Sequence, residues 1–128
     1  MTKLNLSELL NGLTVYKPTH ESDIQKAETT LQTTFAPDYR ECLLQSGIIS
    51  CYGHETTGIS DIQRLNVIQI TQKQRGLNPQ IPLDWYVIEE LHIDNVVAWQ
   101  TFDGTVRLTQ NGRNLGKAAD SLIEYLLS

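Results

Sequence analysis

The most constraining feature of the chain is a change in the spacing of its apolar residues near position 84. Before this point they recur at the helical period, whereas after it aromatic and β-branched residues fill three short segments. Asp103-Gly104, a dipeptide favoured in tight hairpins, separates the second segment from the third. The pattern predicts an antiparallel three-stranded meander, with strands at 84–91, 95–102 and 105–110.

Two helices are predicted close together before the meander. Thr19 or Ser22 can cap the first, whose apolar residues recur at helical spacing: Ile24, Ala27, Leu31 and Phe35. Pro37 marks the start of the second, because proline is tolerated at the first position of a helix, and Gly47 marks its end. Tyr39, Leu43 and Leu44 are predicted to share one side of this second helix.

Weaker signals complete the layout. A short helix is expected from Ser7 to Gly12, and residues 48–59 are expected to form a loop with a short strand or two. The sequence SDIQ at 60–63 has capping-box spacing and predicts a helix running toward Arg75 and stopping at Gly76. After a turn at Asn111-Gly112, ADSLIEYLLS predicts a closing helix. This order predicts an α+β fold, an antiparallel sheet with helices packed mainly on one face.

The bulk properties fit one compact unit. With 128 residues, 40% of them hydrophobic, the chain predicts a single domain spanning 1–128. It contains no apolar run long enough for a membrane helix and no secretion signal, so we expect a cytoplasmic protein. Cys42 and Cys51 match no zinc or redox spacing and are expected to be reduced thiols, with Cys42 half buried. No cofactor and no metal site is predicted.

The negative charge of the chain is concentrated in one stretch. The formal net charge is -5, and no lysine or arginine lies between Gly76 and Val106. Five acids fall inside that interval and account for the imbalance: Asp84, Glu89, Glu90, Asp94 and Asp103. Such a stretch repels nucleic acid and attracts a basic protein partner.

Several segments in order resemble the SUKH superfamily, the Smi/Knr-like proteins. They are ESDIQKAETTLQTTF, APDYRECLLQSG, CYGHETTGI, WYVIEEL, the strand–Asp-Gly–strand hairpin and ADSLIEYL. The resemblance spans about residues 20–127, nearly the whole chain. One departure is Ala36, where the family usually has leucine, which is expected to weaken a core contact while leaving the proline start unchanged.

The resemblance implies a binding role. Bacterial members of the superfamily are mostly immunity proteins, which bind and silence a cognate toxin that is often a nucleic-acid-directed enzyme. A minority, including fungal members, are regulatory hubs in cell-wall synthesis. The short chain is similar to the bacterial type, so we expect a toxin-neutralising protein that occludes an active groove, as a monomer or weak homodimer. An intracellular regulatory or scaffold protein is the alternative.

The residues expected to contact the partner come from the acidic stretch and a nearby loop. They are Asp84, Trp85, Glu89, Glu90, Asp94, Asp103 and Glu55. Carboxylates beside aromatic anchors could occupy the place of phosphate and base in a basic cleft. The alternative is that the aromatics are core and the acids a solvated face. Strict alternation would place Glu89 with Val87 and Glu90 with Tyr86, so both glutamates cannot line one site.

An enzyme is the competing class. His54-Glu55 and a carboxylate pair could perform acid-base chemistry. No nucleophile-base spacing, phosphate-binding glycine loop or metal-ligand cluster accompanies them in the sequence. We therefore expect a protein that is not an enzyme and that binds neither nucleic acid nor membranes.

Overall fold

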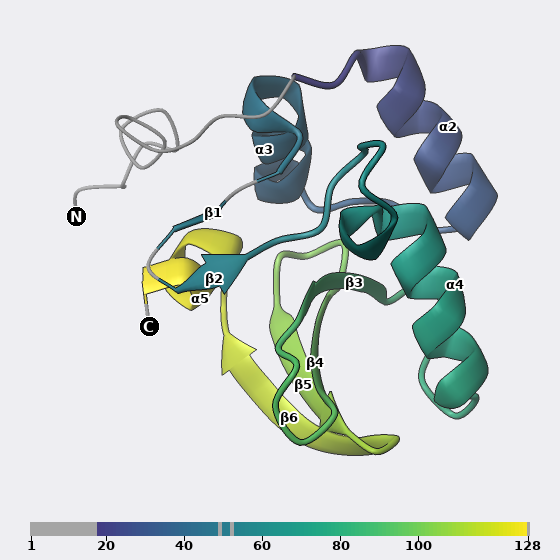
Figure 1. The fold of residues 1–128 in the computed structure, drawn as a ribbon, viewed down its shortest axis with the longest axis vertical. Coiled ribbons are helices and arrows are strands. Elements are labelled where there is room, and N and C mark those ends of the chain that lie inside the picture. The colour runs from purple at the N-terminus through teal and green to yellow at the C-terminus, as the bar shows by residue number, and fades with distance from the viewer. Residues whose placement is uncertain (1–17, 49, 52, 128) are drawn as a thin grey trace.

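The computed structural model describes residues 18–48, 50–51 and 53–127 (Figure 1). The helix expected from Ser7 to Gly12 lies outside these ranges. The helices are α2 (Glu21–Leu31), α3 (Pro37–Ser46), a 3-10 turn η1 (Gln63–Leu65), α4 (Val67–Leu77) and α5 (Leu122–Leu127). The strands are β1 (Ser50–Cys51), β2 (His54–Glu55), β3 (Tyr86–Glu90), β4 (Val96–Gln100), β5 (Val106–Gln110) and β6 (Arg113–Ala119).

Helix α2 begins and ends differently from the sequence prediction. The residue at its N-cap is His20, and no side chain caps the helix, so capping by Thr19 or Ser22 is wrong. The helix ends at Leu31 because Gln32 adopts a left-handed conformation with φ 55°. Phe35 therefore lies beyond the helix, yet it is buried in the core as expected.

Helix α3 confirms the signals at its two ends. Pro37 is its first residue, and Gly47 follows its last with φ 66° while its N–H bonds to the Leu43 carbonyl. The buried side consists of residues spaced three or four apart: Tyr39, Cys42, Leu43 and Ser46. Leu44 falls outside this stripe and is exposed, so its placement on one side with Tyr39 and Leu43 was wrong. Cys42 is fully rather than half buried.

The segment from β1 to α4 was predicted in outline only. β1 and β2 form a two-residue antiparallel pair, which confirms the short strands expected in this loop. The capping box at 60–63 is wrong: Ser60 accepts the Ile62 N–H in a turn. The side chain of Asn66 caps α4 instead, accepting N–H bonds from Ile68 and Gln69.

The main sheet is antiparallel with strand order β3-β4-β5-β6. Both predicted turns are present, with positive φ at Gly104, Asn111 and Gly112. The fourth strand, Arg113–Ala119, was missed. It is a sheet edge, exposed along most of its length, so no apolar alternation reveals it in the sequence.

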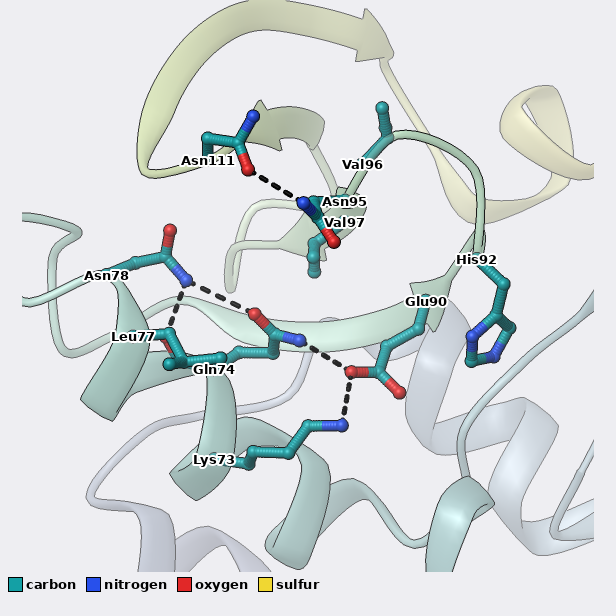
Figure 2. Close-up of a pocket in the computed structure, with 10 residues that line it drawn as sticks. All are labelled: Lys73, Gln74, Leu77, Asn78, Glu90, His92, Asn95, Val96, Val97 and Asn111. Carbon is teal, nitrogen blue, oxygen red and sulfur yellow. Dashed lines mark hydrogen bonds and ion pairs between the residues drawn. The ribbon is translucent and has the colours of Figure 1, made fainter.

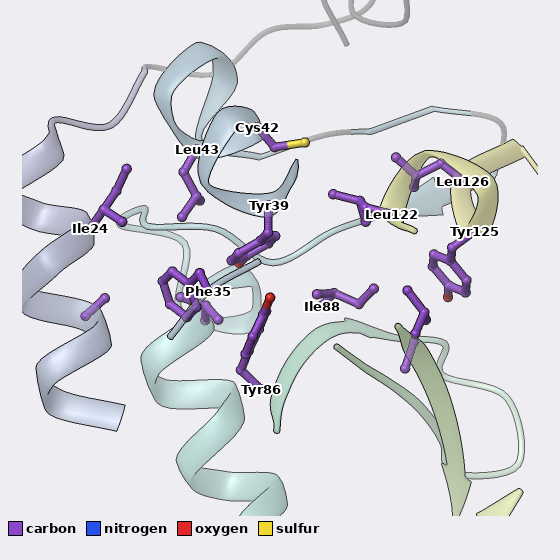
Figure 3. Close-up of a cluster of buried hydrophobic side chains, with 14 of the residues drawn as sticks. Ile24, Phe35, Tyr39, Cys42, Leu43, Tyr86, Ile88, Leu122, Tyr125 and Leu126 are labelled. Atoms are coloured by element: carbon purple, nitrogen blue, oxygen red, sulfur yellow. The ribbon is translucent and has the colours of Figure 1, made fainter. Parts of the chain in front are cut away.

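Two clusters of buried side chains pack on the two faces of the sheet. The helix-side core joins α2, α3, α5 and Val67 of α4 to sheet residues that include Val106. Tyr86 and Ile88 of β3 are seen in it in Figure 3. The smaller loop-side core packs Ile81 and Trp85, from the loop before β3, on Trp99, and Ile70 of α4 joins it. This arrangement confirms the α+β class with helices mainly on one face.

Candidate partner-binding surface

A β-bulge in β3 decides the direction of the two glutamates. Val87 pairs with Trp99 and Glu89 pairs with Ala98, so Ile88 is the extra residue. The bulge moves Glu89 to the helix side of the sheet and Glu90 to the loop side, which is the reverse of the expected assignment. The prediction that the two side chains lie on opposite faces is confirmed, because the bulge changes both positions together.

Glu89 is an interior residue. Its side chain lies 5% exposed and accepts hydrogen bonds from the Tyr125 hydroxyl and from the Glu55 N–H at 2.7 Å. The His54 Nδ1 lies 2.9 Å from Oε1 of the same carboxylate. Glu89 thus joins β3, the β1-β2 hairpin and α5, and its carboxylate has no free surface with which to reach a partner.

The carboxylates of Glu90 and Glu55 are both paired. Glu90 Oε2 lies 2.8 Å from the Lys73 ammonium and 2.5 Å from the Gln74 amide nitrogen. Glu55 Oε1 lies 2.6 Å from Arg64 Nη1 in an exposed ion pair. Each acid is therefore largely balanced by a base from a different part of the chain.

Trp85 is a core residue of the loop-side cluster. Its ring meets that of Trp99 edge to face, with centroids 6.3 Å apart, and the Arg107 guanidinium lies 5.7 Å from its centroid. Tyr86 and Trp99 are also fully buried, whereas Phe102 is 60% exposed. Most of the aromatic side chains in the acidic stretch therefore stabilise the fold.

The three remaining acids, Asp84, Asp94 and Asp103, are exposed, but they lie at two ends of the sheet. Because β3 and β4 are antiparallel, Asp84 and Asp103 lie at one end and Asp94, in the β3-β4 turn, lies at the other. The Thr101 hydroxyl and the Thr105 N–H donate to Asp103 and lower the pKa of its carboxyl group.

Tertiary contacts also bring bases to the acidic stretch. Arg75 donates to the Leu83 and Trp85 carbonyls. Lys73 pairs with Glu90, and the Arg107 guanidinium lies over the Trp85 ring. Residues 77–105 contain no lysine or arginine, but the folded surface around them does. The predicted acids do not form one continuous patch, and partner binding by the exposed three stays a prediction.

A groove that the sequence did not predict lies between the second half of α4 and two turns, β3-β4 and β5-β6 (Figure 2). We name it the hairpin groove; its volume is about 570 Å³. Polar side chains dominate its lining, including Lys73, Gln74, Asn78, Glu90, Asn95 and Asn111. Its asparagines are visible in the sequence, but asparagine is common in turns, so their presence there predicts turns and not a groove.

Neither metal binding nor membrane insertion has positive support in the described residues. Across residues 18–48, 50–51 and 53–127, no group of three or more potential ligands is placed to hold a metal ion. Within the same ranges, no helix combines the length and the apolar character needed to cross a bilayer.

Comparison with known families gives a match over nearly the whole chain. The family model SUKH_5, described as SMI1-KNR4 cell-wall, matches residues 4–128. No curated protein matches the chain significantly.

Proposed function

Because the chain belongs to the SUKH superfamily, in the SMI1-KNR4 family, we propose that it is an immunity protein that binds and neutralises a cognate bacterial toxin. The family match over residues 4–128 carries this proposal, since the family includes immunity proteins. The protein would act in the cytoplasm, forming a one-to-one complex with the toxin domain.

Charge supports a basic partner such as a nucleic-acid-directed enzyme. The net charge of -5 favours association with a positively charged domain. The acids available for this are the exposed ones, Asp84, Asp94 and Asp103, whereas buried Glu89 is not available. A small domain bound over a basic active groove would exclude nucleic acid from it without any chemical step.

The proposal is tested by co-expression with the product of the neighbouring toxin gene. We expect the wild-type chain to protect cells and to bind the toxin domain with a salt-dependent association rate. Failure of the wild-type chain both to protect and to bind would refute the proposal.

A charge-matched pair of variants tests the role of the exposed acids. The first replaces Asp84, Asp94 and Asp103 by asparagine, and the control replaces three exposed acids outside the stretch, by Asp23→Asn, Glu41→Gln and Asp61→Asn. Both remove three negative charges, so any difference reports position rather than net charge. We expect about tenfold slower association for the first and a smaller change for the control. Equal rates would refute a role for the acidic stretch.

A regulatory or scaffold role is the second candidate, favoured by the cell-wall description of the matching family model. In this case no toxin gene would lie beside the gene, and deleting it would sensitise cells to agents that damage the cell wall. Protection against a neighbouring toxin without such a sensitivity would exclude this candidate.

A further inference from the structure

We propose that the hairpin groove binds an extended, basic segment of the partner protein. This inference rests on the proposed function in taking the partner to be the toxin domain, but the groove itself is defined by residues of this chain. Its volume of about 570 Å³ falls in the range of ligand sites, roughly 300–1,000 Å³.

Carboxamide groups in the groove match the hydrogen-bonding pattern of a peptide backbone. Asn78 Nδ2 donates to the Gln74 carbonyl at 2.6 Å, and Asn95 Nδ2 donates to Asn111 Oδ1 at 2.9 Å. Among the described residues, no donor reaches Asn78 Oδ1 or Asn95 Oδ1, and Asn111 Nδ2 has no acceptor. Asn78 is only 5% exposed, whereas Asn95 and Asn111 are exposed, so one acceptor and one donor are available for the N–H and C=O groups of an extended chain.

The two turns that carry Asn95 and Asn111 are held in unusual backbone conformations. Four residues of the two turns have positive φ without being glycine: His92, Asp94, Asn95 and Asn111. Side chains from elsewhere fix both turns, since Gln110 donates to the Asp94 carbonyl and Gln80 donates to the Gly112 carbonyl. The amides are therefore positioned before any partner arrives, which lowers the entropy cost of binding.

Charge favours a basic side chain in the segment. Lys73 and Gln74 both bind Oε2 of Glu90, and among the described residues no donor reaches its Oε1 (Figure 2). Asp94 adds a second, exposed carboxylate at the neighbouring turn. Within the lining, Lys73 balances the charge of Glu90. A lysine or arginine of the partner would therefore pair with Oε1 of Glu90 and with Asp94 in the β3-β4 turn.

Apolar contact is available at the edge of the groove. Leu77 lines it and is 68% exposed, and Val96 and Val97 of β4 also line it. The imidazole of His92 is the only ring among the lining residues, so a nucleobase or sugar would lack the large aromatic platform on which such ligands stack. The lining thus favours a peptide that alternates apolar and basic residues.

Two groove variants, each with a matched control, test this inference. The double variant Asn95→Gly, Asn111→Gly removes the amides at positions whose φ values, 60° and 50°, glycine adopts freely. Its control is Gln32→Gly, which makes the same exchange at φ 55° at the end of α2. Leu77→Ser removes the apolar contact, and its control is Leu83→Ser, a leucine 64% exposed that does not line the groove.

The variants are compared for binding to the neighbouring-gene toxin domain and to synthetic decapeptides that alternate leucine with lysine, or leucine with glutamate. We expect each groove variant to bind the toxin and the lysine peptides about tenfold more weakly than wild type, with the controls unchanged and the glutamate peptides weaker throughout.

The outcomes separate the two proposals. If wild type binds the toxin and the groove variants bind it equally well, this inference is overturned while the immunity function stands. If wild type does not bind the toxin, the immunity function fails and the peptides decide: groove-dependent binding of the lysine set supports the inference, and its absence overturns it.

Discussion

Replacing Glu89 by alanine should remove a large part of the free energy of unfolding of this protein, although the sequence around Glu89 is that of a strand with an acid on its surface. The carboxylate is buried and receives hydrogen bonds from the Tyr125 hydroxyl and the Glu55 N–H, with His54 Nδ1 2.9 Å away. Removing it leaves three groups on two separate elements, β2 and α5, without their partner. The β1-β2 hairpin and α5 would both lose an attachment to the sheet.

The expected magnitude follows from these partners. A hydrogen bond to a charged group contributes about 1.5–3 kcal/mol, and a buried donor left unsatisfied costs about 1–3 kcal/mol. Because the lost bonds and the orphaned donors belong to the same contacts, their energies are not summed. Loss of one partner from a buried charged cluster typically costs about 3–5 kcal/mol. Against a total stability of about 5–15 kcal/mol, this is a large fraction.

Urea unfolding measures this change, with Glu90→Ala as the control on the adjacent residue. Glu90 pairs with Lys73, whose side chain is 53% exposed and can be solvated by water, so we expect a loss of only about 1 kcal/mol. Glu89→Gln keeps one acceptor oxygen and should fall between wild type and Glu89→Ala. If Glu89→Ala unfolds within about 0.5 kcal/mol of wild type, the interior role assigned to this carboxylate is wrong.

Two further predictions concern buried phenols and glycines. Burial raises the pKa of three tyrosines, Tyr39, Tyr86 and Tyr125. The unfolded chain therefore loses these phenolic protons first, near pH 10. The free energy of unfolding should fall above about pH 10, by up to about 4 kcal/mol per pH unit for the three groups together. Tyrosinate absorbance should then rise together with unfolding, and ionisation of these phenols in the folded state would contradict this. Gly58→Ala would place a Cβ 1.4 Å from the Gly47 carbonyl oxygen, so thermal unfolding should show a loss of more than about 3 kcal/mol. Gly76→Ala, a control in α4 with no atom within 4 Å of the new Cβ, should stabilise by about 0.5–1 kcal/mol, and equal effects at both glycines would refute the argument from the close approach.

Features with a local cause were predictable from the sequence. Pro37 and Gly47 bound α3 through their own backbone preferences, and Asp103-Gly104 and Asn111-Gly112 form the two turns for the same reason. Where several residues could act locally, the prediction was wrong: Ser60 offered a capping box, but Asn66 caps α4. The strand β6 had no detectable signal because an exposed edge needs no apolar alternation.

The predicted site depended on tertiary structure much more than the fold did. The sequence by itself determined the α+β arrangement, the turns and the excess of five negative charges, because these follow from local preferences and composition. Only the tertiary structure decided what each acid does. The bulge at Ile88 turned Glu89 into the interior, α4 brought Lys73 to Glu90, and antiparallel pairing separated Asp94 from Asp103. Burial and charge pairing depend on residues distant in the sequence, so the hairpin groove and the exposed acids emerge only when those segments pack together.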